Sequence, residues 1–310
     1  MQHPILEIRQ EAKEYPRLLA QIHDPPKQLY CRGNIKLLNS FCFGVVGTRK
    51  ITSYGKEATQ SIISGLSGTD ITIVSGLALG VDAVAHKAAL DNSLPTIAVL
   101  GSTIDDSGIG PRTNLFLAQE ILENNGLIIS EYKNARDINK SNFAIRDRII
   151  SGLSVGVLIV EGAEHSGSLI TAKSAADQNR DVFAVPGSIF SSVSVGTNEL
   201  IKTGAKLVTS ANDILEEYSN KGLFDNISTP GSESSDSGKS RKKNTSELLL
   251  PGIKNPVEQK ILDILDEKVE LSADEIIRES QEEASKILTS ISMLEIKGAI
   301  KKRGGKYQKT

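Results

Sequence analysis

Serine, glycine and lysine cluster in the stretch SGSLITAK, from Ser166 to Lys173, and these residues are the first candidates for chemistry in this chain. Ser166 and Ser168 can donate their hydroxyl hydrogens at the start of a helix, while Gly167 leaves the neighbouring backbone N–H groups open. Lys173 follows one to two helical turns later. The pattern predicts a cradle for an anion such as a phosphate group. The alternative is a helix cap followed by an exposed lysine.

A second candidate anion site is the stretch GVVGTRK, from Gly44 to Lys50, which follows an apolar run and precedes a helical pattern. Such a turn points backbone N–H groups at a ligand, and the guanidinium of Arg49 suits phosphate oxygens, with Lys50 beside it. The alternative for Arg49 is a surface ion pair. The stretch is not GxGxxG, and no acidic residue ends the next apolar run, so we expect no dinucleotide or other cofactor.

A third candidate set combines an aromatic residue with cations. The stretch KSNFAIRDRIISGLS, which we place in a loop before a buried strand, contains Lys140, Phe143, Arg146 and Arg148. Single-stranded nucleic acid binds to such combinations because bases stack on aromatic rings while cations follow the phosphates. The alternative for Phe143 is a place in the hydrophobic core.

Acid, base and metal chemistry has weaker support in the sequence. Asp82 and His86 lie four residues apart on one helix face, but two ligands do not define a metal site, and capping or packing explains them better. His165 adjoins Ser166 without the GxSxG turn of a serine hydrolase. Glu161 ends an apolar run, and we expect it to orient local backbone amides and not to act as a general base. We therefore expect no catalytic residue and no metal site.

The chain from residue 41 alternates short Val- and Ile-rich runs with amphipathic stretches. This alternation predicts a doubly wound α/β sheet that is Rossmann-like and mostly parallel. The expected strands are 41–47, 71–76, 95–101, 126–132, 155–162 and 181–187. The expected helices are 54–68, 81–92, 113–125, 168–179 and 211–218. Ligands bind such sheets at the carboxyl ends of the strands, close to the candidate residues.

Composition divides the 310-residue chain into four parts. Residues 1–40 form an N-terminal lead-in segment and residues 41–218 the Rossmann-like domain. Residues 219–253, rich in Ser, Gly, Asn and Lys, form a flexible linker. Residues 254–310 form a winged-helix domain, with three short helices followed by a strand, a Gly turn and a strand. The last fifteen residues hold six Lys or Arg and no acid, and they form either a solvated tail or a basic wing that contacts phosphate or protein.

Charge and cysteine content limit the class of protein. The net charge is -2, and residues 41–218 hold 14 Lys and Arg against 19 Asp and Glu. An anion site must therefore be local, because no general positive field surrounds the protein. Cys31 and Cys42 are too few for a disulfide framework and fit a reducing compartment. No apolar run approaches bilayer-spanning length and the N-terminus lacks a signal-peptide pattern, so we expect a cytoplasmic protein without membrane insertion.

The motifs of residues 15–218 resemble, in their order, those of the DNA-processing protein A family, DprA or Smf, of bacterial recombination mediators. They are YPRLLAQIHDPPKQLYCRG, VVGTRK, VSGLALGVDAVAH, TIAVLGS, RIISGLS, SGSLITAKSAADQNRDVFAVPGSIF and GTNELIKTGAKLVTS. The tail from residue 254 resembles the winged-helix domain of many members. The resemblance implies a non-enzymatic protein that binds single-stranded DNA with little sequence preference. It also implies a homodimer, formed through the Rossmann-like domain, that helps to load RecA recombinase during uptake of transforming DNA.

The same resemblance assigns a DNA pocket to this chain. The pocket contains Arg49, Lys140, Phe143 and the cradle around Ser166 to Lys173. For the dimer contacts, the apolar faces of NELIKTG and NDILEEY are candidates.

Three departures from the family pattern fall near this pocket. Family members usually have GLARGID where this chain has Leu79, and RNRIIAGLS where this chain has Asp147 in place of Asn. The usual Tyr-Pro pair is Gly110 and Pro111 here, with Asn114 retained. These departures predict weaker or altered DNA contact at that edge.

Two other functions are compatible with parts of the sequence. A nucleotide-processing enzyme related to phosphoribohydrolases would share a Rossmann-like fold, but it would need a PGGxGT loop with a nearby glutamate. Neither FAVPGSIF nor GVVGTRK supplies that loop. A chromosome-binding regulator would act through the winged helix alone.

Overall fold

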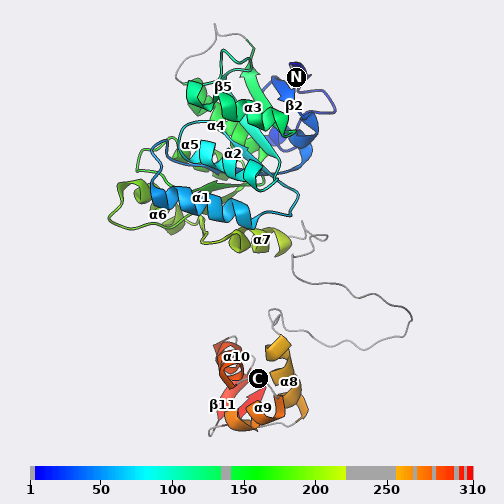
Figure 1. Cartoon of the computed structure of the whole chain (residues 1–310), viewed down its shortest axis with the longest axis vertical. Coiled ribbons are helices and arrows are strands. Elements are labelled where there is room, and N and C mark those ends of the chain that lie inside the picture. Colours follow the sequence, from blue (N-terminus) through cyan, green and yellow to red (C-terminus); the bar gives the residue numbers. More distant parts are fainter. Residues whose placement is uncertain are drawn as a thin grey trace, which may run out of the picture. The chain divides into compact units, whose positions relative to one another are not determined.

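The computed structural model describes residues 4–133, 141–220, 256–267, 271–280, 284–296, 300–303 and 306–309. The chain divides into two compact units, residues 1–233 and 234–310 (Figure 1). From residue 221 on, the linker predicted over residues 219–253 lies outside the described residues. None of the helices in the described ranges combines the length and the apolar character that crossing a bilayer requires.

A nine-stranded sheet forms the centre of the first unit. Its strands are β1 (Leu6–Arg9), β2 (Gln28–Gly33), β3 (Phe41–Val46), β4 (Ile71–Ser75), β5 (Thr96–Thr103), β6 (Leu127–Tyr132), β7 (Gly156–Ile159), β8 (Asp181–Ala184) and β9 (Lys206–Leu207). Their order is β1-β2-β6-β5-β4-β3-β7-β8-β9. All neighbours from β6 to β9 pair in parallel, whereas β1 and β2 are antiparallel additions. The predicted Rossmann-like, mostly parallel sheet is confirmed.

Within the segment 1–40, predicted as a lead-in, residues 4–40 belong to this sheet and its core. They supply β1 and β2, and β2 pairs with β6. Leu19 and Leu29 are fully buried in the same hydrophobic cluster as strand and helix residues from later in the chain. The N-terminal segment therefore packs as part of the first unit.

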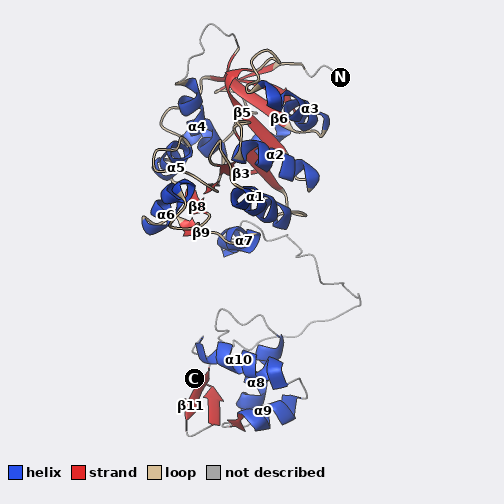
Figure 2. Cartoon of the chain, turned by 60° about the vertical axis from the view of Figure 1, so that its left-hand side comes forward, coloured by secondary structure: helices blue, strands red, loops and turns tan. Residues whose placement is uncertain are grey.

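Helices cover both faces of the sheet (Figure 2). They are α1 (Ser53–Gly65), α2 (Val81–Asp91), α3 (Leu115–Glu123), α4 (Asn142–Leu153), α5 (Ser168–Asp177), α6 (Val195–Lys202) and α7 (Ala211–Asn220). Helices α4 and α5 pack on one face, and α1, α2 and α7 pack on the other. Helix α3 covers β5 and β6 beside α2. Because helices occupy both faces of the sheet, a ligand can reach the strands only at their ends.

Helix α4 replaces the loop that the sequence predicts for KSNFAIRDRIISGLS, from residue 142 on. Ile149, Ile150 and Leu153 recur at helical spacing in this segment and are buried in the core below α4. Charged side chains precede them and obscure the apolar period. Residues 142–153 are helical, although a loop is predicted, because one short apolar stripe packs against the sheet and stabilises the helix.

The direction in which the sheet grows changes at β3. From β3 the chain adds β4, β5 and β6 on one side, and it then crosses over to add β7, β8 and β9 on the other side. The loops that follow β3 and β7 therefore diverge, although the two strands are hydrogen-bonded neighbours. Doubly wound sheets bind ligands at such a switch point.

The second unit contains helices α8 (Pro256–Glu267), α9 (Ala273–Ser280) and α10 (Ala284–Ile296). Its antiparallel sheet has the order β10-β12-β11, with β10 (Leu271–Ser272), β11 (Ile300–Arg303) and β12 (Lys306–Lys309). Buried side chains from all three helices and all three strands form one core. Three helices followed by a two-stranded hairpin are the arrangement predicted for the winged helix.

Tyr218 of α7 anchors an aromatic cluster below the sheet, and its loss tests the packing. Its ring centroid lies 5.2 Å from that of Phe41, 6.2 Å from Phe43 and 6.0 Å from Phe183, and Tyr218 is 1% exposed. We expect Tyr218→Ala to lower the free energy of unfolding by about 3–5 kcal/mol, because the deletion leaves a cavity. Denaturant unfolding measures this change. Phe190→Ala is the control, because that ring is 93% exposed; equal losses in both variants would contradict the assignment.

Candidate nucleic-acid interface

The turn between β3 and α1 carries the first cation of the site. The N–H of Thr48 donates to the carbonyl of Glu161 at 2.8 Å, and the carbonyl of Thr48 accepts from the N–H of Val81 at 3.2 Å. The turn is thus held between the loops that follow β7 and β4. The exposed guanidinium of Arg49 lies over the ring of Phe143, with Cζ 5.9 Å from the ring centroid. Two residues predicted from separate stretches are therefore in contact.

Arg49 and Phe143 border a cavity of about 420 Å³, called here the polar cavity. Its walls come from the turn after β3, the start of α2, the start of α4 and the start of α5, so it lies at the switch point of the sheet. It is lined by Val46, Gly47, Arg49, Ala78, Asp82, Phe143, Ala144, Arg146, Asp147, Ser166, Gly167, Ser168, Ile170 and Thr171.

The N-terminus of α5 forms one wall of the polar cavity. Ser166, Gly167 and Ser168, predicted as an anion cradle, lie together there. The two hydroxyl oxygens are 2.9 Å apart, and the N–H of Ser168 donates to Oγ of Ser166 at 3.4 Å. A Cβ at Gly167 would meet no atom within 4 Å, so the backbone is open on that side. The N–H groups of Leu169 and Ile170 donate to the carbonyls of Ser166 at 3.0 Å and Gly167 at 2.9 Å. This wall therefore offers an anion the two serine hydroxyls and the positive end of the helix dipole.

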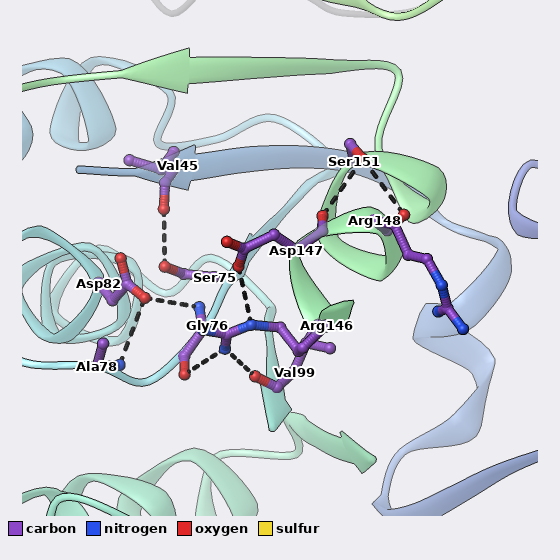
Figure 3. Close-up of polar contacts among 10 residues, drawn as sticks. All are labelled: Val45, Ser75, Gly76, Ala78, Asp82, Val99, Arg146, Asp147, Arg148 and Ser151. Carbon is purple, nitrogen blue, oxygen red and sulfur yellow. Dashed lines mark hydrogen bonds and ion pairs between the residues drawn. The ribbon is translucent and has the colours of Figure 1, made fainter. Parts of the chain in front are cut away.

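Arg146 lies in the floor of the polar cavity and is 5% exposed (Figure 3). Its Nη1 donates to the carbonyls of Gly76 at 2.7 Å and Val99 at 2.5 Å, and its Nε donates to Oδ1 of Asp147 at 3.1 Å. A Cβ at Gly76 would collide with the guanidinium, so this position requires glycine. Arg146 was predicted to bind DNA, and the structure holds its Nη1 and Nε in place by these bonds. Within the described parts of the chain, no hydrogen bond involves its Nη2.

Two carboxylates share this floor with Arg146. Oδ2 of Asp82 accepts from the N–H groups of Gly76 at 3.1 Å and Ala78 at 3.4 Å (Figure 3). Burial raises the pKa of Asp82, against the lowering effect of Arg146. Burial also raises the pKa of Asp147 to about 6, with Arg146 lowering it and Asp82 raising it. The polar cavity therefore combines cations with carboxylates, one of which titrates near neutral pH.

A smaller cavity of about 300 Å³, called here the apolar cavity, adjoins the polar one. It shares Arg49, Phe143 and Arg146 with the polar cavity, and Leu79 and Pro111 add apolar surface. Leu79 is 46% exposed. Leu79, which stands where family members usually have a cation, therefore provides a hydrophobic wall beside Phe143.

The profile of the family described as DNA recombination-mediator protein A matches residues 7–219. The chain belongs to this family. A second profile, described as the DprA winged helix domain, matches residues 249–306 and identifies the second unit. The family consists of recombination mediators, not of nucleotide-processing enzymes. The membership predicted from the motifs is confirmed.

Curated relatives agree with this assignment. DNA processing protein DprA of Streptococcus pneumoniae is 44% identical over 204 residues, which are 66% of this chain and 71% of that protein. Protein Smf of Escherichia coli is 44% identical over 209 residues, which are 67% of this chain and 55% of that protein. DNA processing protein DprA of Bacillus subtilis is 41% identical over 207 residues, covering 66% of this chain and 69% of that protein.

Two solved structures of the family share the fold. The X-ray structure of DprA from Streptococcus pneumoniae has a TM-score of 0.65 at 41% identity, covering 69% of this chain and 74% of that one. DNA processing protein A from Helicobacter pylori, studied for its single-stranded DNA binding mode, has a TM-score of 0.62 at 33% identity. That match covers 71% of this chain and 97% of the other.

Arg148, a predicted DNA-binding residue of this DprA/Smf family member, points away from the polar cavity. Its Nη2 donates to both carboxylate oxygens of Glu131, at 2.9 and 3.0 Å, and its Nε donates to Oδ2 of Asp24 at 3.2 Å. Figure 3 shows its guanidinium directed away from Asp82 and Arg146. Arg148 does not join Arg146 at the polar cavity because α4 is a helix, and two residues along a helix rotate the side chain by about 200°.

Lys173 also lies outside the polar cavity. It lines a separate cavity with side chains of α5 and α6. Lys173 follows Ser168 by five residues, which is a rotation of about 140° around the helix. The two residues predicted to form one cradle therefore line different cavities. Lys50 is exposed next to Arg49 but does not line the polar cavity. Lys140 lies outside the described residues.

Glu161 and His86 have the supporting roles that the sequence favours. Oε2 of Glu161 accepts from the N–H of Thr52 at 3.0 Å and Oε1 from its hydroxyl at 2.5 Å, which fixes the start of α1. Nδ1 of His86 pairs with the hydroxyl of Thr96 at 2.7 Å inside the core. In the described part of the chain, no group of three His, Cys, Asp or Glu side chains could hold a metal ion.

Asp82 and Thr171 are cavity residues that sequence reasoning did not place in the site. Thr171 follows Ser168 by three residues and therefore lies on the same helix face. This spacing in the sequence could have placed Thr171 in the site. Asp82 starts α2 after the glycine-rich end of β4, but only the fold brings this turn beside α5.

Asp147→Asn tests the buried carboxylate through stability. The folded pKa of about 6 exceeds the ordinary value of about 3.9, so the folded state binds the proton more tightly than the unfolded state. This contribution to stability is fully present below about pH 3.9 and is lost as the pH rises through about 6. We expect the free energy of unfolding of wild type to fall relative to that of the variant as the pH rises from about 4 to about 7. The change in this difference should be on the order of 2–3 kcal/mol. Denaturant unfolding at several pH values measures this change.

The same substitution at the exposed Asp177, which does not line the polar cavity, controls for the loss of one carboxylate. A difference between Asp147→Asn and wild type that stays constant across this pH range would refute the assignment.

Proposed function

We propose that this chain is a mediator of DNA recombination that binds single-stranded DNA in the polar cavity. A backbone phosphate is held by Arg49 and the N-terminus of α5, and a base stacks on Phe143. Membership of the DNA recombination-mediator protein A family supports the proposal, as does the similarity to the Helicobacter pylori protein studied for its single-stranded DNA binding. The two free, buried cysteines, Cys31 and Cys42, fit a place of action in the cytoplasm.

The observation that carries the proposal is the contact between Arg49 and Phe143 beside the serine hydroxyls at the N-terminus of α5. A nucleotide needs a cation or N–H groups for its phosphate and a flat apolar face for its base. The polar cavity has both. The protein has a net charge of -2, so binding depends on these local groups. A few contacts to backbone phosphates suit a protein that binds a single strand without reading a long base sequence.

We further propose that the chain acts as a homodimer and helps to load RecA recombinase onto the bound strand, as the family resemblance implies. Of the two candidate dimer segments, α7 turns Ile214 and Tyr218 into the core beside α1, so its apolar face is covered. Edge strand β9 ends the sheet and exposes Leu207 by 45%, and α6 beside it carries Val195, 42% exposed. The α6–β9 edge is therefore the better candidate for the dimer contact.

Arg49→Glu tests the phosphate contact. We expect the affinity for a labelled oligothymidine to fall about 10- to 100-fold, because a charge-assisted hydrogen bond is replaced by repulsion. The slope of affinity against salt concentration should also become shallower, because fewer counterions are released. Fluorescence anisotropy at several salt concentrations measures both quantities.

Lys173→Glu is the matched control, because it reverses the same charge on an exposed side chain outside the polar cavity. Unchanged binding by folded Arg49→Glu, or equal losses in the two variants, would place the strand elsewhere.

Phe143→Ala tests the stacking platform. We expect binding of the same oligonucleotide to weaken by about 1–3 kcal/mol, because one base loses its aromatic partner. Phe143→Tyr keeps the ring and should retain most of the affinity. A variant that folds normally and binds like wild type would remove Phe143 from the site, and a variant that fails to fold would assign the ring to the core.

A further inference from the structure

The floor of the polar cavity places a hydrogen-bond donor directly beside an acceptor. Nε of Arg146 donates to Oδ1 of Asp147 at 3.1 Å, while Nη2 has no hydrogen-bond partner among the described residues. An ionised carboxylate has about four acceptor sites. Arg146 and the side chain of Thr171 use two of those of Asp147, which leaves room for two further bonds. The two side chains are only 5% and 12% exposed. Unused hydrogen-bonding capacity at a buried position is costly, and a ligand that fills it is favoured.

The ring of Phe143 lines the same cavity as this donor–acceptor pair. A base that stacks on the ring lies in the cavity, and its Watson–Crick edge is the part that can meet polar groups in the floor. Proteins recognise unpaired bases in this way, by stacking on the face and by hydrogen bonds to the edge.

Guanine fits a donor beside a carboxylate better than the other bases. Its edge carries O6, which accepts, followed by N1–H and N2–H, which both donate. Adenine and cytosine each present a single donor group on this edge. Thymine has one N–H between two carbonyls, and one of these carbonyls would face the carboxylate. A carboxylate that accepts from both N1 and N2 makes a bidentate contact, which discriminates strongly between bases.

We propose that the polar cavity recognises a guanine ring, with Asp147 as the specificity-determining residue. The carboxylate of Asp147 accepts from N1 and N2, and Nη2 of Arg146 donates to O6. The inference rests on the proposed function, because it uses the same cavity, and it adds the identity of the preferred base. The ring can arrive as part of a DNA strand or as a free guanine nucleotide.

The test compares the affinity of the full chain for three labelled strands by fluorescence anisotropy. The first is a short oligothymidine, the second has one central guanine, and the third has inosine at that position, which lacks the N2 amino group. We expect the guanine strand to bind about tenfold more tightly than the oligothymidine, as one good bidentate contact provides. The inosine strand should lose most of this gain, which tests the contact without altering the protein.

Asp147→Asn removes the charged acceptor, and we expect it to abolish the preference for guanine while it still binds oligothymidine. Glu164→Gln is the matched control, because Glu164 is an exposed carboxylate in the loop before α5 that does not line the polar cavity. This control should keep the preference. Competition with guanosine and thymidine monophosphates then distinguishes the sources of the ring, since stronger displacement by the guanine nucleotide means that the free nucleotide is recognised as well.

The outcomes separate the inference from the proposed function. Equal affinity of wild type for the guanine and thymine strands would overturn the inference and leave the proposed function intact. A preference that survives in folded Asp147→Asn would overturn the role of Asp147. Failure of wild type to bind any of the strands would overturn the proposed function itself.

Discussion

The buried guanidinium of Arg146 is the interaction on which the site depends. A buried cation needs hydrogen-bond partners and a balanced charge. Nη1 of Arg146 has the carbonyls of Gly76, directly after β4, and of Val99 in β5, and Nε has the carboxylate of Asp147. These bonds tie α4 to the sheet. They thereby set the position of Phe143, one helical turn earlier, against the turn that carries Arg49.

The charges of the polar cavity are arranged so that few of them are available to a ligand. Asp82 and Asp147 compensate Arg146, which fixes the floor without giving it a large positive potential. Attraction for a phosphate is left to the exposed Arg49 and to the N-terminus of α5. The same carboxylates add acceptors to a cavity that would otherwise offer donors only. A site of this kind can distinguish the edge of a base as well as hold a phosphate.

Sequence patterns located the turns that line the polar cavity, but they did not indicate the directions of side chains on helices. Arg49 and the cradle at Ser166 and Ser168 lie in turns that follow strands. In a parallel sheet such turns meet at the carboxyl ends of the strands. Arg148 and Lys173 lie within helices, where a shift of one or two residues turns a side chain from the site to the opposite face. The helical state of residues 142–153 depends on burial of one short apolar stripe, so local pattern alone did not indicate it.

The sequence by itself determined the alternation of strands and helices from residue 41, except for α4 and α6, as well as the winged-helix unit and the turns that face the site. It could do so because hydrophobic period and turn chemistry are local properties of the chain. Only the tertiary structure decided which cations are available to a ligand. Arg148 pairs with Asp24 and Glu131, and Nη1 of Arg146 is bound to backbone carbonyls far away in sequence. Arg49, in contrast, is exposed over an aromatic ring. The availability of a charge depends on partners from distant segments, and no local pattern encodes those partners.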